Sequence, residues 1–230
     1  MRNRLLASLP AEDYALIAPH LTAVELERGR LLYDPGDPIE TIYFPQDGVI
    51  SLMTLMENGA AIESATIGRE GALGLMAAVS PRQSLSRIIV QTPVKATRIG
   101  AGAMHEAWDK SAAIKDLVDK HTEALFGHAI QSVACNALHP VEARFCRWLL
   151  TCHDRISNDT VALTQEFLAD MLGVQRTTVT AVARSLQEKG AIRYRRGVVD
   201  IIDRPALEAL ACECYGAINR TYERLLPPEH

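Results

Sequence analysis

The side chains with the clearest binding chemistry lie in one stretch of the chain, residues 164–197. Its second part, residues 176–197, carries six basic side chains against Glu188 as the one acidic side chain. Basic groups at this density suit a polyanion, because they neutralise phosphates and because an arginine can form a bidentate pair with guanine. The net charge of the whole chain is −4, so the attraction is local. The six basic residues are Arg176, Arg184, Lys189, Arg193, Arg195 and Arg196.

The spacing around the start of this stretch predicts two short helices joined by a sharp turn. Thr164 is a good N-cap, and Glu166 follows in the first turn, where the helix dipole favours a carboxylate. Gly173 ends the first helix and allows the backbone to turn. The second helix is expected to start near Gln175 or Arg176. This arrangement is typical of a helix-turn-helix, whose second helix lies in the major groove of DNA.

Small side chains on the outward face of the second helix, among them Ala181, allow it to lie deep in a groove. Residues 193–202 are expected to form a two-stranded wing that turns at Arg196-Gly197, where arginines suit phosphates or the minor groove. The alternative is a solvated charge run on a helical hairpin, which does not explain the glycine, the basic bias and the wing together. The residues expected to contact DNA are Thr164, Gln175, Arg176, Thr177, Thr178, Thr180, Arg184, Arg195 and Arg196.

Short β-prone runs separated by turns indicate what precedes these helices, and regular spacing of such runs is typical of a jelly-roll barrel. Asn58-Gly59 predicts a tight hairpin, and Thr92-Pro93 is expected to join the last two strands as a pair. Two short helices are expected within residues 1–19, before the strands. The strands are expected near residues 42–44, 49–55, 60–67, 87–91 and 94–99.

A long helix is expected between the barrel and the helix-turn-helix, over residues 111–139, and Pro140 ends it. Apolar side chains on more than one face suggest that it covers the barrel with one face and pairs with a second copy through the other. The alternative is a fully buried helix in a monomer. A second apolar row holds Phe126, Ile130, Val133 and Ala137. The side chains expected on the dimer seam are Ile114, Val118, His121, Leu125, His128 and Ser132.

The fold class is therefore α+β, with a jelly-roll barrel (1–110), a long dimerisation helix (111–139) and a winged helix-turn-helix (140–230). The chain has 230 residues and a mean hydropathy of +0.01, and no apolar run is long enough for a membrane span or a secretory signal. All five cysteines fall at or after Cys135, without a Cys-x-x-Cys pair. We therefore expect a cytoplasmic protein with reduced thiols, and neither a disulfide scaffold nor a zinc module.

Catalysis is not expected from these residues. A metal-dependent barrel enzyme needs clustered His, Glu and Asp ligands, and the predicted barrel strands have only His20 at their edge. No nucleophile and base are paired by the sequence pattern either. We therefore expect a binding protein that is not an enzyme and has no cofactor.

At this point the chain resembles the Crp/Fnr family of bacterial transcription regulators over nearly its whole length. The resemblance rests on the order of the three parts and on the runs Gly71–Leu75, Gly173–Val179 and Asp203–Leu207. It implies a homodimer that binds a pseudo-palindrome in double-stranded DNA and contacts RNA polymerase, for which residues 157–160 are the candidate loop.

The resemblance also assigns roles within the second helix. Arg176 stands at the position that usually contacts a guanine, and Thr164 is expected to hold a phosphate. Thr177 replaces a glutamate that reads a base in many members, and Ala181 replaces a second arginine. A half-site different from that of the best-known members is therefore expected.

The sensor barrel departs from the cyclic-nucleotide pattern of the family. Ala72 occupies the position of the ribose-binding glutamate, Arg82 is followed by Gln83-Ser84, and Gln131-Ser132 does not match the adenine-binding pair of the long helix. These departures argue against cyclic AMP and leave the effector unknown. The residues of a possible effector pocket are Glu70, Gly71, Ala72, Arg82 and Arg87.

Other sensing chemistries of the family remain alternatives. An iron–sulfur cluster needs N-terminal thiolates, which are absent before Cys135. A haem ligand could come from His105, His121 or His128, although hydrogen-bonded seam residues are the simpler interpretation of the last two. Cys212 and Cys214 are interpreted as free thiols, with a redox switch as the alternative. The alternative function is thus an effector-gated regulator that responds to a cyclic nucleotide or to a haem-bound gas.

Overall fold

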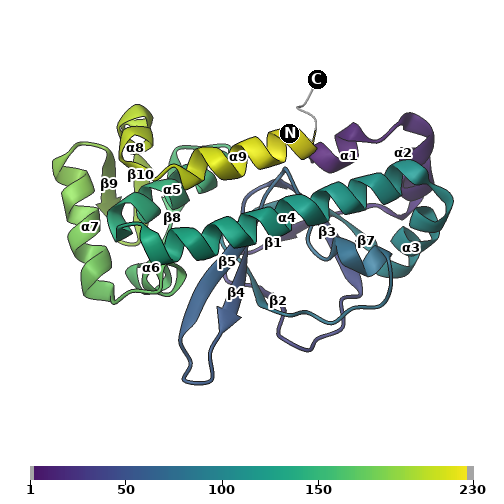
Figure 1. Cartoon of the computed structure of the whole chain (residues 1–230), viewed down its shortest axis with the longest axis horizontal. Helices are drawn as coiled ribbons and strands as arrows, with labels where there is room; N and C mark the ends of the chain where they lie inside the picture. Colours follow the sequence, from purple (N-terminus) through teal and green to yellow (C-terminus); the bar gives the residue numbers. More distant parts are fainter. Residues whose placement is uncertain (1–2, 227–230) are drawn as a thin grey trace.

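The computed structural model describes residues 3–226 and begins with two short helices (Figure 1). Asn3 caps the first, because its side-chain oxygen accepts hydrogen bonds from the amides of Leu5 and Leu6. Acidic residues in the first turn of the second helix favour its N-terminus, as expected. A 3-10 turn over Ala18–His20 then leads into the strands. The two helices are α1 (Arg4–Ser8) and α2 (Ala11–Ile17).

Two antiparallel sheets form the N-terminal barrel, one with the strand order β1-β7-β3 and one with the order β2-β6-β4-β5. Their apolar side chains meet in a core that includes Leu26, Ile50 and Val90, all buried. The predicted fold class of this part, a β-sheet barrel, is confirmed. The strands are β1 (Thr22–Leu26), β2 (Leu31–Tyr33), β3 (Thr41–Asp47), β4 (Ile50–Leu55), β5 (Ala61–Ile67), β6 (Arg87–Val90) and β7 (Val94–Gly100).

The pairing of the last two strands differs from the expectation. β6 pairs with β2 and β4, whereas β7 pairs with β1 and β3, so Thr92-Pro93 carries the chain from one sheet to the other. Thr92 Oγ1 accepts a hydrogen bond from the Val49 amide (2.9 Å), which fixes this crossing against β4. The local sequence could not distinguish the crossing from a hairpin, because both need a turn at a proline.

The hairpin at Asn58-Gly59 is present but wider than a two-residue turn. The Met56 amide donates to the Ala60 carbonyl (2.8 Å), and the Gly59 amide donates to the Met56 carbonyl (2.9 Å). Within this loop, residues 57–59, only Gly59 has a positive φ, +84°. The loop therefore follows the three-residue pattern with one left-handed glycine instead of the tight turn that needs two such residues.

Two helices follow the barrel, α3 (Ala101–Lys110) and the 27-residue α4 (Ala112–Leu138). Ser111 separates them and caps α4 by accepting a hydrogen bond from the Ile114 amide (2.9 Å). His139 ends α4 in an extended conformation, as expected of a residue before proline. α4 runs along the barrel for most of the length of the molecule (Figure 1).

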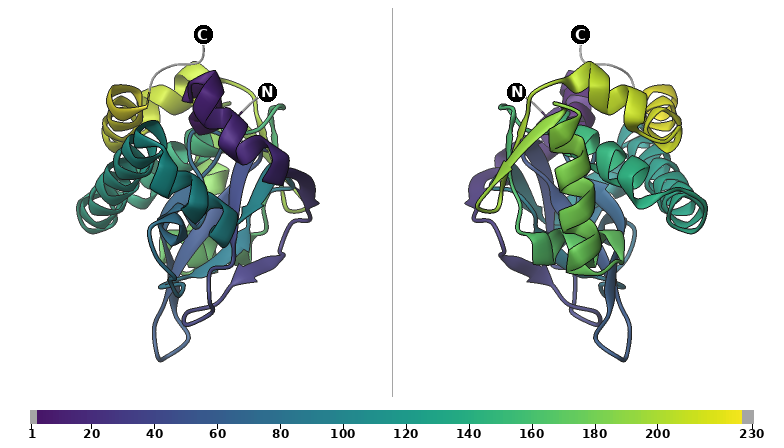
Figure 2. Two further views of the ribbon diagram at one scale, coloured as in Figure 1. Left: turned by 90° about the vertical axis from the view of Figure 1, so that its right-hand side faces the viewer. Right: turned by 90° about the vertical axis from the view of Figure 1, so that its left-hand side faces the viewer.

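The C-terminal part holds a helical core and a small sheet at one end of the molecule (Figure 1), and this end faces the viewer in the right-hand view of Figure 2. Its sheet has three strands in the order β8-β10-β9, one more than the two-stranded wing that we expected, because residues 160–162 pair with β10. The last helix, α9, returns along α4 and packs against it. The elements are α5 (Val141–His153), β8 (Thr160–Ala162), α6 (Gln165–Leu172), α7 (Arg176–Glu188), β9 (Ile192–Arg195), β10 (Val198–Ile201), α8 (Arg204–Leu210) and α9 (Cys214–Leu225).

The barrel and the C-terminal part share one apolar core, because Val49, just before β4, and Met53 of β4 pack with the buried side chains of α5, α6 and α7. A buried polar contact crosses the same boundary. Trp148 Nε1 donates to Glu63 Oε1 (2.9 Å), and Ser51 Oγ donates to Glu63 Oε2 (2.7 Å). Burial raises the pKa of Glu63 to about 7. The two hydrogen bonds and the positive charges of Arg147 in α5 and Arg155 just after it oppose this rise.

Glu63→Gln is expected to make the protein more stable at pH 8 and to change little at pH 5. A carboxyl whose pKa rises from 4.5 to about 7 on folding binds its proton more tightly in the folded chain. Its contribution is therefore fully present below pH 4.5 and is lost as the pH rises to about 7. That loss corresponds to about 3 kcal/mol in the free energy of unfolding.

Urea unfolding of the variant and the wild type at both pH values checks this expectation. The difference between the two proteins isolates Glu63 from other titrating groups. Glu57→Gln, an exposed substitution in the adjoining β4–β5 hairpin loop, is the control and should leave the pH profile unchanged. A Glu63→Gln protein whose pH profile equals that of the wild type would contradict the assignment.

Candidate nucleic-acid interface

The helix-turn-helix forms where the sequence predicted it. Thr164 Oγ1 accepts a hydrogen bond from the Phe167 amide (3.2 Å) and caps α6. Gly173 ends α6 with a left-handed φ of +62°, and the Val174 amide closes the turn on the Ala169 carbonyl (2.9 Å). Fully buried Val179 and Leu186 of α7 then pack against α6. The crossing of the two helices is therefore held by a glycine turn and an apolar seam.

The opposite face of α7 is open to solvent. After Arg176, the exposed positions in its first two turns are Thr177, Thr180 and Ala181, whose short side chains leave room for a close approach to a DNA groove. Thr178 is half-buried and is the one predicted contact of α7 that turns partly toward the protein. The exposed predicted residues are Gln175, Arg176, Thr177, Thr180 and Arg184.

Arg176 lies at the start of α7 and reaches back to α6. Its Nη1 is 2.6 Å from Glu166 Oε1, and its Nε donates to Gln165 Oε1 (3.1 Å). The side chains of both partners of the ion pair are more than 60% exposed, at 63% for Arg176 and 62% for Glu166. An ion pair in this setting contributes about 0–1 kcal/mol, so the guanidinium can exchange it for a base edge.

The wing carries the other predicted cationic contacts. Arg196 and Gly197 both have positive φ, at +49° and +76°, which is the backbone of a two-residue hairpin turn. Arg195 and Arg196 are exposed at this tip. The Tyr194 hydroxyl donates to the Leu163 carbonyl (3.0 Å) and holds the wing against the entry to α6.

A groove joins these elements. It runs between the N-terminal ends of α6 and α7 and the wing tip, and it places a helix N-cap, a recognition-helix arginine and a wing arginine around one opening. Amide groups at a helix N-terminus and arginine side chains both bind phosphate oxygens. The lining residues are Thr164, Gln165, Glu166, Arg176, Tyr194, Arg196 and Gly197.

Two other basic residues of this region are held by acidic partners. Arg184 Nε is 2.8 Å from Glu188 Oε1 on the same helix. Lys189 pairs with Glu142 of α5, which ties the end of α7 to the domain core. Arg184 remains exposed enough to meet a phosphate, while Lys189 acts as a structural contact.

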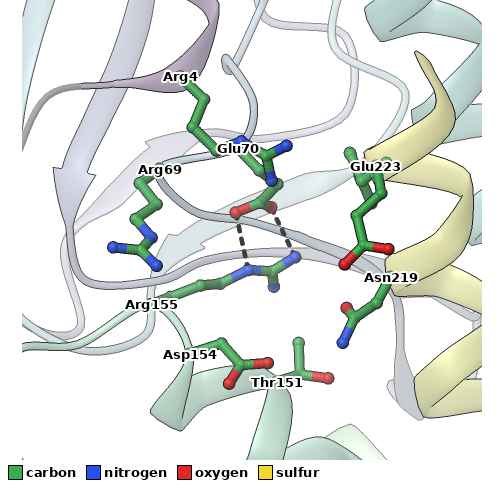
Figure 3. A pocket seen from close by; sticks show the side chains of 9 residues that line it. Arg4, Arg69, Glu70, Thr151, Asp154, Arg155, Asn219 and Glu223 are labelled. Carbon is green, nitrogen blue, oxygen red and sulfur yellow. Dashed lines mark hydrogen bonds and ion pairs between the residues drawn. The ribbon is translucent and has the colours of Figure 1, made fainter. Parts of the chain in front are cut away.

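The predicted effector residues do not come together in one cavity. Glu70 turns away from the barrel interior and binds Arg155, which follows α5: Arg155 Nη2 is 2.6 Å from Glu70 Oε1, and Arg155 Nε donates to Glu70 Oε2 (3.1 Å) (Figure 3). Arg155 Nη1 also donates to Thr66 of β5. Glu70 and Arg155 are both buried, so this contact couples the barrel to the DNA-binding end. Arg155 could not be predicted from the sequence, because nothing in its neighbourhood shows a partner 85 residues away.

Arg87 and Arg82 are also placed elsewhere. Arg87 forms a two-point ion pair with Asp34, with Nε 2.6 Å from Oδ1 and Nη2 3.1 Å from Oδ2. Arg82 is exposed, and its carbonyl accepts a hydrogen bond from the Ile39 amide (2.9 Å). In this structure neither arginine contacts Glu70, whose partner is Arg155.

His121 fills the space beside the remaining two residues of that set. Its Nε2 accepts a hydrogen bond from the Ala72 amide (3.0 Å). A Cβ added at Gly71 would lie 3.0 Å from the same nitrogen, so the glycine permits this close approach. Burial lowers the pKa of His121 to about 4, which keeps the ring neutral and able to accept.

The side chains predicted for the dimer seam of α4 lie on a face that is covered within the single chain. Leu125 packs partly buried against the barrel core, and His128 contacts Tyr222 of α9, with ring centroids 6.1 Å apart and the rings edge to face. Burial holds the pKa of His128 well below its usual value. α9 and the barrel cover this face within one chain, and the sequence did not reveal where α9 packs. The other residues buried there are Ile114, Val118, His121 and Ser132.

The second apolar row of α4 is the exposed one. Phe126, Ile130 and Val133 have exposed fractions of 66%, 55% and 72%. Ala137 continues the same row and is exposed too. Large apolar side chains that recur on one face of a long helix are typical of a helix–helix interface.

His105, the third candidate haem ligand, is bound to its own surroundings. Its Nδ1 lies 2.8 Å from the Ala78 carbonyl oxygen, its Nε2 lies 3.7 Å from Asp109, and its ring stacks near Trp108. The three histidines thus occupy separate places along α3 and α4.

Within residues 3–226, no helix combines the length and the apolarity needed to cross a membrane.

Two family models match the chain. A cyclic nucleotide-binding domain matches residues 23–111, and a Crp-like helix-turn-helix domain matches residues 143–210. A curated relative, the global nitrogen regulator of Nostoc sp. (strain PCC 7120), is 22% identical over 185 residues, which cover 76% of this chain and 82% of the relative.

Solved structures with the same fold include FixK2 from Bradyrhizobium japonicum. It has a TM-score of 0.70 at 16% identity, covering 84% of this chain and 98% of that one. A transcriptional regulator of the CRP family from Thermus thermophilus has a TM-score of 0.65 at 21% identity, covering 82% and 96% of the two chains. These likenesses span the barrel, the long helix and the helix-turn-helix together.

Proposed function

The chain belongs to the Crp/Fnr family of DNA-binding transcription regulators and is not an enzyme, and from this premise we propose that it acts as a homodimer that reads a pseudo-palindrome through α7. The observation that carries the proposal is the exposed outer face of α7 beside the wing, with Arg176 at its start. The protein would work in the cytoplasm, where its DNA is.

The exposed apolar row of α4 supports the homodimer. A parallel pair of α4 helices would cover Phe126, Ile130 and Val133 with the same residues of the second copy. A two-fold axis along this seam places two α7 helices on one side of the dimer. Two-fold symmetry in the protein then requires a two-fold site in DNA, with half-sites about 10 bp apart.

Contacts within each half-site follow from the geometry of the protein groove between α6, α7 and the wing tip. We assign Arg176 to a guanine in the major groove, with Gln175 and Thr177 beside it, since these side chains are exposed at the start of α7. Thr164 and Arg196, which both line this protein groove, are assigned to DNA phosphates that flank the bases. Small Thr180 and Ala181 let α7 approach the base pairs closely.

The sensor barrel is proposed not to bind cyclic AMP. Glu70, the carboxylate among the residues predicted for the pocket, is engaged by Arg155, and His121 occupies the space next to Gly71 and Ala72. A ribose hydroxyl would have to displace a buried ion pair. Calorimetric titration with cyclic AMP is expected to show no binding, and a measurable affinity would favour the effector-gated alternative.

Selection of random duplex DNA by the purified, ligand-free protein tests the proposed function. We expect an enriched two-fold pseudo-palindrome with half-sites one helical turn apart. Enrichment of unpaired half-sites would contradict the dimer, and the absence of any enriched sequence would contradict DNA reading by the free protein. In that second case, adding cyclic nucleotides or haem one at a time would test for gating.

Arg196→Ala is expected to weaken binding to every DNA sequence by a similar factor. A wing arginine that meets a phosphate adds affinity without sequence preference. The slope of log affinity against log salt should fall by about one per chain, or two per dimer. Arg98→Ala on the exposed face of β7 is the control and should leave both quantities unchanged. A changed base preference would instead assign Arg196 to base reading.

A contact with RNA polymerase is proposed for the loop before β8. Ser157, Asn158 and Asp159 are exposed there, at the edge of the DNA-binding domain. Substituting this loop should reduce activation of a promoter while leaving DNA affinity unchanged. Equal transcription by the substituted and wild-type proteins would contradict the assignment.

A further inference from the structure

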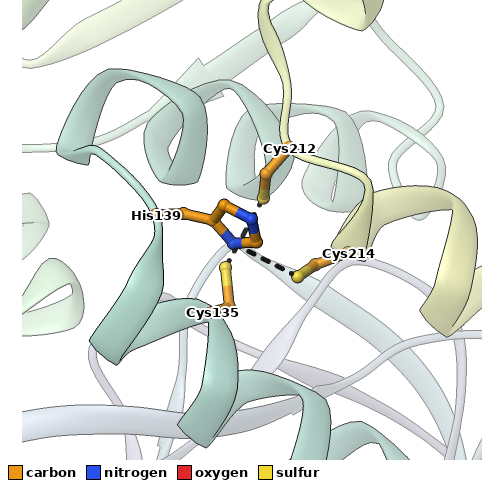
Figure 4. Close-up of side chains that lie close together, drawn as sticks. All are labelled: Cys135, His139, Cys212 and Cys214. Carbon is orange, nitrogen blue, oxygen red and sulfur yellow. Dashed lines mark hydrogen bonds between the residues drawn. The ribbon is translucent and has the colours of Figure 1, made fainter.

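Three cysteines and a histidine meet where the long helix joins the DNA-binding domain (Figure 4). Cys135 lies in the last turn of α4, and His139 caps that helix. Cys212 lies just before α9, and Cys214 is its first residue. The four potential ligand atoms all lie within 4.8 Å of one another. The sequence predicts free thiols at Cys212 and Cys214, and the structure shows neither in a disulfide, with Cys135 and His139 beside them.

The separations suit a single tetrahedral ion. The Cys135 and Cys212 sulfurs are 3.5 Å apart, and the Cys214 sulfur is 3.5 Å from His139 Nδ1. A tetrahedral zinc ion with Zn–S bonds of about 2.3 Å would place its sulfur ligands about 3.8 Å apart. A disulfide would require a separation of about 2.05 Å.

The surroundings orient the ligands as a metal site requires. His139 Nε2 lies 3.0 Å from Glu213 Oε2, so the carboxylate can hold the tautomer that leaves the Nδ1 lone pair facing the sulfurs. Gln131 Nε2 donates to the Cys214 sulfur (3.0 Å). A carboxylate behind a histidine ligand and a donor toward a thiolate are the usual outer contacts of such centres.

Burial and charge favour a closed, structural site. The cysteines are nearly inaccessible, with exposed fractions of 0% for Cys135, 7% for Cys212 and 0% for Cys214. Three thiolates and a neutral histidine around Zn²⁺ would carry a net charge of −1. The buried guanidinium groups of Arg144 and Arg147 on α5 are close enough for their charges to act on Cys135.

We propose that Cys135, His139, Cys212 and Cys214 bind one Zn²⁺ ion, which fastens the start of α9 to the end of α4. Soft thiolates together with one imidazole favour zinc over magnesium or calcium. The site itself does not depend on the proposed function. One consequence does rest on the proposed function. Loss of the zinc ion should lower the affinity of the protein for the selected palindrome, because the ion lies where α4 joins the DNA-binding domain.

Metal analysis of the full chain purified under reducing conditions tests the site directly. We expect one zinc per chain, and replacement by Co²⁺ should give the ligand-field and charge-transfer bands of a tetrahedral thiolate centre. Metal-free protein with free thiols, or with a Cys135–Cys212 disulfide, would overturn the proposal. Iron with inorganic sulfide would overturn it too. None of these readouts involves DNA, so failure of the site and failure of the proposed function are separate results.

Variants locate the ion. Cys212→Ser is expected to lose the zinc, whereas Cys146→Ala, a buried cysteine of α5 outside the cluster, should keep one zinc per chain. Glu213→Gln changes an exposed side chain and leaves all four ligands in place, so folding should persist. The zinc affinity should fall about 10- to 100-fold. Unchanged zinc content in Cys212→Ser, or unchanged affinity in Glu213→Gln, would overturn the assignment.

Discussion

Arg176→Ala is expected to abolish the preference of the dimer for its selected palindrome while leaving weak binding to arbitrary DNA. A bidentate arginine–guanine pair contributes about 1–3 kcal/mol of discrimination. A dimer makes this contact twice, so the expected loss is about 2–6 kcal/mol, or roughly 30- to 10⁴-fold in the specificity ratio. Competition binding with the palindrome and a scrambled duplex measures that ratio.

The free protein does not hold Arg176 strongly enough to change this expectation. Its pair with Glu166 is exposed and contributes at most about 1 kcal/mol. A base contact can therefore replace it. Glu166→Gln removes the ion pair and keeps the side chain's size, so it should preserve the base preference and change affinity only slightly.

Arg98→Ala is again the control for loss of a positive charge away from the interface. If Arg176→Ala keeps the specificity ratio of the wild type, α7 does not enter the groove with its first turn. The recognition surface would then have to be sought in the wing or in a different part of α7.

The helix-turn-helix could be predicted because its signals are local. Thr164, Gly173 and Arg196-Gly197 each determine the conformation of their own few residues, through a cap, a left-handed turn and a hairpin turn. The order of residues between these signals then leaves little freedom to α6, α7 and the wing. The third strand, β8, was missed because three residues carry too weak a pattern.

The faces of α4 could not be assigned from the sequence, because two apolar rows were visible and periodicity does not say which row meets which neighbour. The deciding partner is α9, whose Tyr222 lies against His128. Histidines on a predicted seam suggested a wet interface, whereas the structure buries them inside one chain. Glu70 and Arg155 show the same limit for a polar contact between distant segments.

The cysteine–histidine cluster shows what a spacing rule can and cannot detect. Cys135 and His139 stand one helical turn apart, and Cys212 and Cys214 stand two residues apart, so neither pair matches Cys-x-x-Cys. Each pair alone is common. Only the return of α9 along α4 brings the two pairs within the reach of one ion.

Phe126→Glu is expected to convert the dimer to a monomer and to remove binding to the full palindrome. Phe126 is 66% exposed in the single chain, and burying a phenylalanine side chain contributes about 1.5–3 kcal/mol. Two copies contribute about twice that, and two glutamates facing each other across the axis would add repulsion. The dimer dissociation constant should therefore rise by at least about 10²-fold.

Light scattering after size-exclusion chromatography, over a range of protein concentrations, measures this constant. Leu85→Glu is the matched control, because Leu85 is 93% exposed on a barrel loop and lies outside the row on α4. It places the same charge on the surface and should leave the dimer intact.

A single half-site offers a further distinction, since a folded Phe126→Glu monomer should bind it with the weak affinity of one α7 helix. If the variant remains dimeric and still binds the palindrome, the two copies associate through a surface other than the apolar row of α4. The two-fold site in DNA would then follow from a different axis, and the half-site spacing expected for paired α4 helices would no longer apply.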